Sequence, residues 1–107
     1  MNVFDIFIAY VTWDGGGKMR PLLIIEQQKT VLFAFNITTQ YENKSESVRS
    51  NYFKILDWQQ AGLDKPSYVD TNVVRNLPLV VLNNKSAIGR LTEADIKRFI
   101  QFLSSER

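Results

Sequence analysis

The order of apolar and polar positions predicts strands in the first half of the chain. Residues 3–11 are almost entirely apolar and aromatic, and the turn at 14–17, which contains three glycines, separates them from the apolar run at 22–25. A glycine-rich turn between two apolar runs predicts a β-hairpin. A polar connection at 26–29 follows, and residues 30–37 then resume with the β-branched and aromatic side chains typical of a buried strand. We therefore expect three sequential strands.

The middle of the chain shows a weaker pattern. Residues 40–50 are polar and charged without an apolar period, which predicts a long exposed loop of the kind that is often functional or mobile. Shorter pieces are expected beyond it, namely a strand at 52–56, a helical turn at 57–61 ended by Gly62, and strand segments at 69 and 73–77 interrupted by Pro66 and Pro78.

The C-terminal segment has a helical period. Apolar side chains recur at the spacing of one helical face, at Ile96, Phe99, Ile100 and Leu103. Thr92 and Asp95 have the spacing of a capping-box variant just before this face. Strands that follow one another and end with one helix predict an α+β domain. We expect a small, strongly curved antiparallel sheet or SH3-like barrel with the C-terminal amphipathic helix packed on it.

Composition changes this picture little. The chain has 107 residues, of which 45% are hydrophobic and 22% charged, values that suit one globular domain spanning residues 1–107. It has no cysteine, which excludes disulfides and thiolate metal sites. No stretch approaches the roughly 20 apolar residues of a membrane span, and the first residues carry no basic leader. We expect a cytoplasmic protein that makes no membrane contact.

The absence of histidine restricts the possible chemistry more than the charge does. Histidine is the usual general base and the commonest metal ligand, so catalysis here must use other groups, and we expect neither a metal nor a cofactor. The net charge of +2 and a pI near 9.0 permit contact with nucleic acid but do not require it.

Several short segments resemble, in order and spacing, the motifs of the MazF/PemK toxins. They are Phe-Asp-Ile at 4–6, Arg-Pro-Leu-Leu-Ile-Ile at 20–25, Asn-Ile-Thr-Thr at 36–39, Gly-Leu-Asp-Lys-Pro-Ser-Tyr-Val-Asp at 62–70, and Ile-Gly-Arg-Leu-Thr-Glu-Ala-Asp at 88–95. Each motif is weak by itself, but their common order over almost the whole chain makes the resemblance specific.

The resemblance implies a five-stranded barrel-like sheet with helices, a homodimer, and metal-independent cleavage of single-stranded RNA at short sequence motifs. It also implies a protein antitoxin that covers the site. The catalytic arginine of the family, which follows the glycine-rich turn and precedes proline, matches Arg20. The threonine that ends its third strand matches Thr38.

The chemistry of RNA cleavage makes these two residue types suitable. Without a metal, the ribose 2′-OH attacks the adjacent phosphorus, and the phosphorane needs cationic or hydrogen-bonding groups to hold its oxygens. Arg20 would supply a charged two-pronged donor, and Thr38 a short hydroxyl that orients a phosphate oxygen or the leaving group. The products would be a 2′,3′-cyclic phosphate and a 5′-hydroxyl. The alternatives are a solvated arginine at a strand start and a threonine that only packs in a strand.

The acid that would accept the proton is the least determined part of the site. Some family members carry an acid in the turn before the arginine, but glycines occupy residues 15–17 here. The family-like segment at 62–70 contains two acids, Asp64 and Asp70, and we take Asp70 as the candidate general base because it ends the Pro-Ser-Tyr-Val-Asp part of this segment. A packed, purely structural Asp70 is the alternative.

Other residues are candidates for binding RNA. Trp13, Asp14 and Lys18 flank the hairpin turn, where an aromatic ring can stack on a base and an ammonium can contact phosphate. Thr39 would add a second hydroxyl beside the catalytic threonine. Arg75 would bind a phosphate or form a structural salt bridge, and core packing is the alternative for Trp13.

Three further residues are expected to have structural roles. Tyr52 and Trp58 are large aromatic residues that we place in the core or at an interface. Arg98 falls on the polar side of the C-terminal helical period, so we expect it on the solvated face of that helix.

A different class of function is a toxin that binds a protein partner without cutting RNA. The CcdB toxins, which poison DNA gyrase, resemble this expected fold, but their gyrase contact uses an aromatic-glycine ending. This sequence ends with Ser-Ser-Glu-Arg at 104–107, which argues against gyrase as the target. An inactive relative that serves as an interaction domain is a third possibility.

Overall fold

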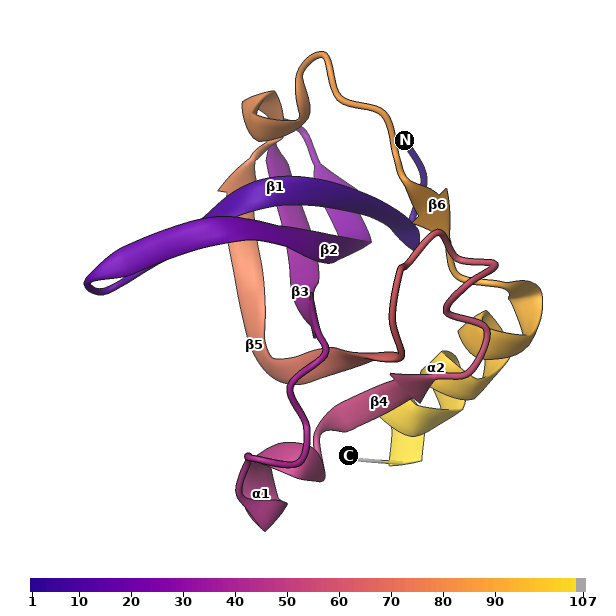
Figure 1. Cartoon of the computed structure of the whole chain (residues 1–107). Coiled ribbons are helices and arrows are strands. Elements are labelled where there is room, and N and C mark those ends of the chain that lie inside the picture. The colour runs from indigo at the N-terminus through magenta and orange to yellow at the C-terminus, as the bar shows by residue number, and fades with distance from the viewer. Residues whose placement is uncertain (106–107) are drawn as a thin grey trace.

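Six antiparallel strands form one strongly curved sheet in the order β4–β5–β3–β2–β1–β6, as Figure 1 shows. This computed structural model describes residues 1–105, without the side chain of Trp13. The strands are β1 Asp5–Trp13, β2 Gly16–Gln28, β3 Val31–Thr38, β4 Tyr52–Ile55, β5 Ser67–Pro78 and β6 Gly89–Arg90. The helical elements are α1 Glu46–Arg49, the 3-10 turn η1 Leu79–Leu82, and α2 Glu93–Ser105.

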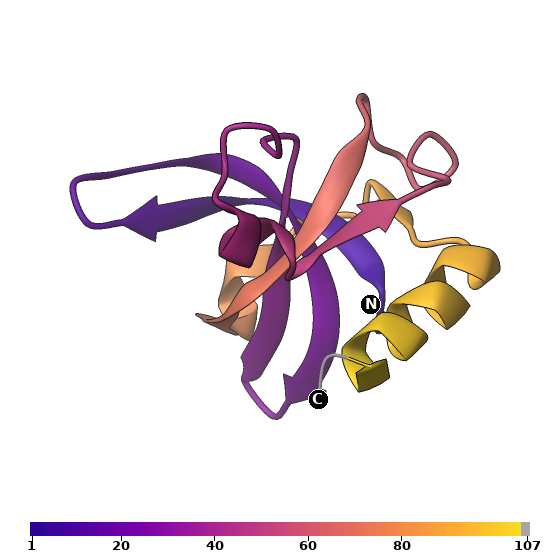
Figure 2. The same ribbon diagram turned by 90° about the horizontal axis from the view of Figure 1, so that it is seen from below.

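The curvature of the sheet comes with irregular strand pairing. The β2–β3 register shifts between Ile24 and Glu26, and the β3–β5 register shifts between Phe35 and Asn36. Extra residues on one strand bend it and increase its twist. The view in Figure 2 shows the resulting half-barrel, with the β1–β2 hairpin extending to one side and α2 lying at the other.

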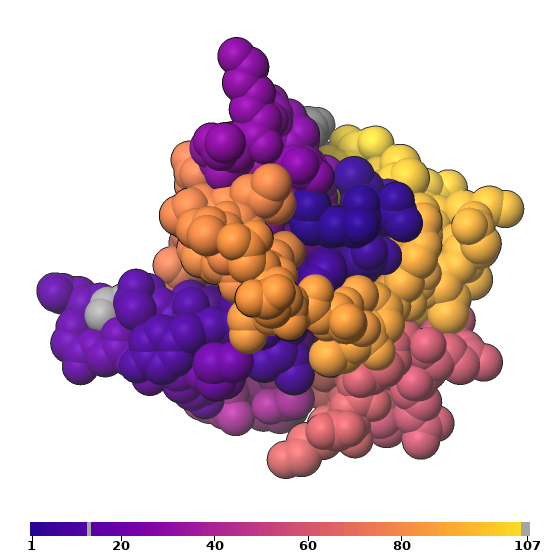
Figure 3. Space-filling model, turned by 90° about the horizontal axis from the view of Figure 1, so that it is seen from above, coloured from indigo at the N-terminus to yellow at the C-terminus, as the bar shows by residue number. Residues whose placement is uncertain are grey.

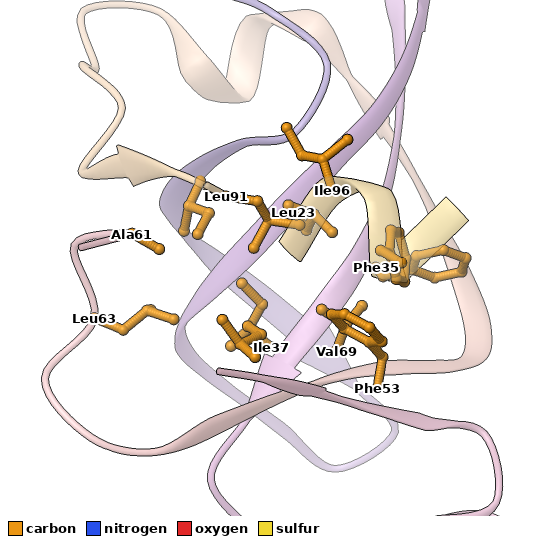
Figure 4. Packing of buried hydrophobic residues seen from close by; sticks show 12 residues of the cluster. Leu23, Phe35, Ile37, Phe53, Ala61, Leu63, Val69, Leu91 and Ile96 are labelled. Carbon is orange, nitrogen blue, oxygen red and sulfur yellow. The ribbon is translucent and has the colours of Figure 1, made fainter. Parts of the chain in front are cut away.

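Both faces of the sheet are covered by apolar side chains at its centre. The larger cluster lies between the sheet and α2 and contains the aromatic rings Phe35, Phe53 and Phe99. Figure 4 labels Phe35 and Phe53 among its members. A second cluster on the opposite face includes Leu22, Ile24 and Leu82. Coverage of both faces explains why the apolar run at 22–24 is continuous instead of alternating.

The predicted fold class is confirmed, including the curved antiparallel sheet and the C-terminal helix, but the sheet has six strands where the resemblance implies five, because the short strand β6 pairs with β1. Part of the predicted capping box at the start of α2 is also present, because the Asp95 N–H donates to the Thr92 hydroxyl at 3.3 Å. The return bond differs from the capping-box pattern. The Asp95 carboxylate instead accepts hydrogen bonds from the backbone N–H groups of Leu56 at 3.3 Å and Asp57 at 2.8 Å.

Three local predictions need correction. The polar segment at 26–29 is not simply a connection, since β2 continues to Gln28 and pairs with Val31, and the turn falls at residues 29–30. The loop at 40–50 contains the short helix α1. The strand segments at 69 and 73–77 belong to one strand, β5, which the two prolines border instead of dividing. The bounds of β2 and β5 depend on backbone pairing with β3, which the polarity of the side chains does not reveal.

Candidate functional site

The structure brings Arg20 and Thr38 into one pocket where β2 and β3 diverge. The last paired residues of these two strands near the pocket are Leu22 and Asn36. Arg20 and Thr38 each lie two residues beyond that pair, so they fall on the same face of their strands. Both residues line a small pocket of about 170 Å³, together with Lys18 and other residues.

The Thr38 hydroxyl is held in place by the chain that follows it. Thr38 is only 8% exposed, and its Oγ1 accepts a hydrogen bond from the backbone N–H of Gln40 at 3.0 Å. A hydroxyl that accepts one bond still has its own O–H to donate. Thr38 therefore has a determined orientation and can act as a donor in the pocket.

Asp70 lies on the next strand of the sheet, β5, and is not among the residues that line the Arg20–Thr38 pocket. It pairs with Asn36 of β3 on one side and with Tyr52 of β4 on the other. One oxygen of its carboxylate, Oδ1, accepts from both the backbone N–H and the side-chain amide of Asn72, at 2.9 Å and 2.8 Å. These two bonds orient the carboxylate at the position where β5 departs from regular pairing with β3.

Tyr52 links Asp70 and Arg20 electrostatically. Burial raises the pKa of the Tyr52 hydroxyl above its ordinary value, the negative charge of Asp70 raises it further, and the positive charge of Arg20 opposes the rise. Both charges are therefore near enough to act on the same phenol. The burial of Tyr52 agrees with the core position that the sequence predicts for it.

Three tyrosines gather beside Thr38. The rings of Tyr41 and Tyr68 are stacked, with their centroids 4.4 Å apart and an angle of 14° between their planes, and Tyr52 lies about 6 Å from both. Tyr68 pairs directly with Thr38 in the β3–β5 register, and the Arg49 guanidinium lies 5.4 Å from the Tyr41 ring. This tyrosine cluster attaches the segment between β3 and β4 to the sheet.

The sequence analysis did not identify Tyr41 or Tyr68. The alternation of side chains along β5 could have placed Tyr68 and Asp70 on one face, since they are two residues apart. Tyr41 carried no such signal, because it lies in the irregular segment between β3 and α1.

The other candidate RNA-binding residues are placed unevenly. Lys18 and Thr39 are exposed and line the pocket. Asp14 is exposed in the hairpin turn, outside the pocket lining. The side chain of Trp13 lies outside the described part of the structure, so the prediction for it stays a prediction.

Arg75 occupies a half-buried position on β5. When the amide oxygen of Asn36 faces it, that oxygen accepts from both Nε and Nη2 of Arg75 at 3.2 Å. Asn36 is the neighbour of Asp70 in the strand register, so Arg75 is held near the site by a neutral group. This contact is compatible with either a structural or a phosphate-binding role.

Neither a metal centre nor a membrane helix emerges from the part of the chain that is described. Among residues 1–105, no three or more acidic side chains gather closely enough to hold a metal ion. None of the described helices has the length and apolar character needed to cross a membrane. A larger hollow of about 830 Å³ lies between β4 and α2, and neither Arg20 nor Thr38 lines it.

The class of fold is a strongly curved antiparallel sheet with one C-terminal helix, and a solved toxin structure shares it. The toxin MazF-mt6 of Mycobacterium tuberculosis matches with a TM-score of 0.68, and the match covers 94% of this chain and 93% of that one. The two sequences are 21% identical. The chain therefore has the fold of a MazF toxin, which confirms the resemblance at the level of the fold. No protein-family model matches the sequence, and no curated protein matches it.

Proposed function

We propose that the protein is a metal-independent endoribonuclease toxin that cleaves single-stranded RNA. The observation that supports this most strongly is the presence of Arg20 and Thr38 in one pocket at the diverging ends of β2 and β3. An arginine beside a held hydroxyl suits the binding of a phosphate. The fold shared with a MazF toxin agrees with this chemistry.

In the proposed reaction, the RNA supplies its own nucleophile. The ribose 2′-OH attacks the neighbouring phosphorus, and its proton passes to the Asp70 carboxylate. The Arg20 guanidinium binds the phosphorane oxygens, and the Thr38 hydroxyl donates to one of them. The bond from phosphorus to the 5′ oxygen then breaks, that oxygen takes up a proton from water, and Asp70 returns its proton to the solvent. A 2′,3′-cyclic phosphate and a 5′-hydroxyl result.

The surroundings of the pocket supply groups that bind single-stranded RNA. Lys18 and Arg75 are cationic, and Thr39 offers a second hydroxyl beside the catalytic threonine. The tyrosine cluster combines aromatic rings with the positive charge of the arginine beside it, as single-strand binders do. Trp13 and Asp14 at the hairpin turn would extend this surface. We also propose that the toxin acts in the cytoplasm as a homodimer and is inhibited by a protein antitoxin.

Cleavage in the presence of a chelator tests the proposal. Labelled single-stranded RNA should be cut by the purified protein in excess EDTA, because no described side-chain cluster would hold a metal. Gel electrophoresis and analysis of the new ends would detect cyclic phosphates. If EDTA abolishes cutting and magnesium restores it, the mechanism is wrong. If the protein inhibits growth but never cuts RNA, a toxin that only binds a partner becomes the better explanation.

A further inference from the structure

A second cavity lies next to the Arg20–Thr38 pocket. Its volume is about 400 Å³, which is within the range of roughly 300–1,000 Å³ typical of small-molecule sites. Apolar side chains form one part of its lining, namely Ile8, Pro21, Leu63 and Ile88. Polar side chains form another part, namely Thr39, Asp64, Lys65 and Ser67. An apolar cavity with a few polar groups suits a flat, partly polar ligand.

The two cavities adjoin each other. Pro21, Thr39 and Ser67 line both of them, so a single ligand can occupy both at once. Ser67 is buried and its hydroxyl donates to the Lys65 carbonyl at 2.7 Å, which holds the start of β5 against the loop before it. A nucleotide bound by its phosphate in the Arg20–Thr38 pocket would therefore have a neighbouring base at the entrance of the second cavity.

Two glycines allow close backbone packing between the two chain segments that form one wall of the second cavity. A Cβ on Gly62 would overlap the carbonyl oxygen of Ile88, and a Cβ on Gly89 would overlap the carbonyl oxygen of Ala61. Gly62 also has a positive φ of 95°, which side chains disfavour. The Ile88 N–H donates to the Ile6 carbonyl at 2.8 Å and joins this wall to β1. Figure 3 shows the loop before β5, in rose, lying beside the orange segment that leads to β6.

We propose that the second cavity binds the nucleobase next to the scissile phosphate, an inference that rests on the proposed function. Ile8 and Ile88 are each 39% exposed and present apolar surface that can cover the faces of a base. The Asp64 carboxylate accepts hydrogen bonds from base N–H groups, while Lys65 and Thr39 donate to base carbonyls or to the next phosphate. Because the wall is held backbone to backbone, the cavity is formed before RNA binds.

Abasic substrates test whether this cavity holds a base. Sequencing of RNA ends first identifies the nucleotides on each side of the cut, and synthetic oligonucleotides then carry an abasic residue at either position. At one of these positions, loss of the base should slow cleavage by wild-type protein about tenfold, since the buried apolar surface of the base is lost. Ile88→Ala should already cut the intact oligonucleotide more slowly and should lose little further activity on the abasic one.

A matched substitution separates the cavity from a general effect on the surface. Ile100 on α2 is another exposed isoleucine, 49% exposed, and does not line the cavity. Ile100→Ala should retain the full sensitivity to the abasic residue. If neither abasic oligonucleotide slows the wild type, or if Ile88→Ala is as sensitive as the wild type, the base subsite is wrong although RNA cleavage still stands.

A binding measurement keeps this inference separate from the proposed function. If the wild type does not cut RNA, fluorescence anisotropy with a 2′-O-methyl oligonucleotide of mixed sequence, with and without its bases, replaces the cleavage assay. Base-dependent binding that Ile88→Ala weakens and Ile100→Ala does not would support the subsite while the nuclease proposal fails. Equal binding of both oligonucleotides, or no binding, would overturn the subsite as well.

Discussion

At the scale of single residues, the site depends on where two strands stop pairing. Leu22 and Asn36 are the last partners of β2 and β3 on this side, and the residues beyond them no longer pair with each other. No backbone pairing joins β2 and β3 beyond this point, so Arg20 and Thr38 are not cross-strand neighbours. They line a pocket between the two strands. This geometry is compatible with the proposed roles of Arg20 and Thr38, which stay predictions.

Replacement of Arg20 should reduce RNA cleavage strongly. Arg20→Ala removes the charged donor for the phosphorane, so we expect a rate loss of about a hundredfold or more, as for the loss of comparable donors. Arg20→Lys should restore only part of the rate, because lysine retains the charge but lacks the planar two-donor group. Single-turnover cleavage of labelled RNA measures both, and wild-type rates in both variants would mean that the site lies elsewhere.

Replacement of Thr38 separates chemistry from packing. Thr38→Val keeps the β-branched shape but removes the hydroxyl, which also loses the bond from the Gln40 N–H, so we expect about 1 kcal/mol of lost stability as well as slower cleavage. Thr38→Ser retains the hydroxyl and should cut faster than the valine variant. Rates are compared with unfolding free energies from urea titrations. A valine variant that is less stable but equally fast would limit Thr38 to a structural role.

At the scale of elements, one carboxylate joins the C-terminal helix to the sheet. Asp95 is fully buried near the start of α2 and accepts from the backbone N–H groups of residues 56 and 57, directly after β4. It also forms an ion pair with Arg98, whose guanidinium donates to the Lys54 carbonyl and lies 4.7 Å from the Phe53 ring. Arg98 therefore packs against β4, although the helical period alone predicts a solvated position for it.

Loss of this carboxylate should destabilise the protein. Asp95→Ala removes the acceptor of two backbone N–H groups and the ion-pair partner of Arg98. We therefore expect a loss of about 3 kcal/mol in the free energy of unfolding. Glu93→Gln is the matched control, because Glu93 is an exposed acid in the same first turn. Urea unfolding followed by circular dichroism measures both. Equal stability of the two variants would show that the helix does not depend on Asp95.

At the scale of the whole molecule, several large apolar side chains face solvent. Tyr10, Leu56, Val73, Val80 and Ile100 are all about half exposed or more and lie on different elements. Single exposed apolar side chains are normal on a protein surface, so they do not by themselves indicate self-association. The homodimer that the resemblance implies therefore stays a prediction.

Light scattering at several concentrations tests the homodimer. We expect a mass twice the 12.4 kDa of the chain at micromolar concentration, because a symmetric pair would cover part of this apolar surface. The mass should fall toward that of one chain only on dilution. A constant mass of one chain throughout the micromolar range would contradict the homodimer.

The sequence by itself determined the features that depend on neighbouring residues. Alternating and continuous apolar runs located β1, β2 and β3, and the helical period of Ile96 and Phe99 located α2. The order of short motifs indicated Arg20 and Thr38 as candidate catalytic residues, and the fold brings both into one pocket. The absence of histidine and cysteine excluded catalysis and metal binding by imidazole and thiolate groups, because no fold can supply a side chain that the chain lacks.

Only the tertiary structure decided the features that join distant parts of the chain. The stacking of Tyr41 on Tyr68 depends on how the segment after β3 returns to the sheet. The role of Asp95 depends on the backbone after β4 lying against α2, and the second cavity depends on β1 and the segment before β6 lying side by side, so that Ile8 and Ile88 both line it. Such contacts are set by strand register and sheet curvature, which residues near in sequence do not specify because many registers satisfy the same apolar pattern.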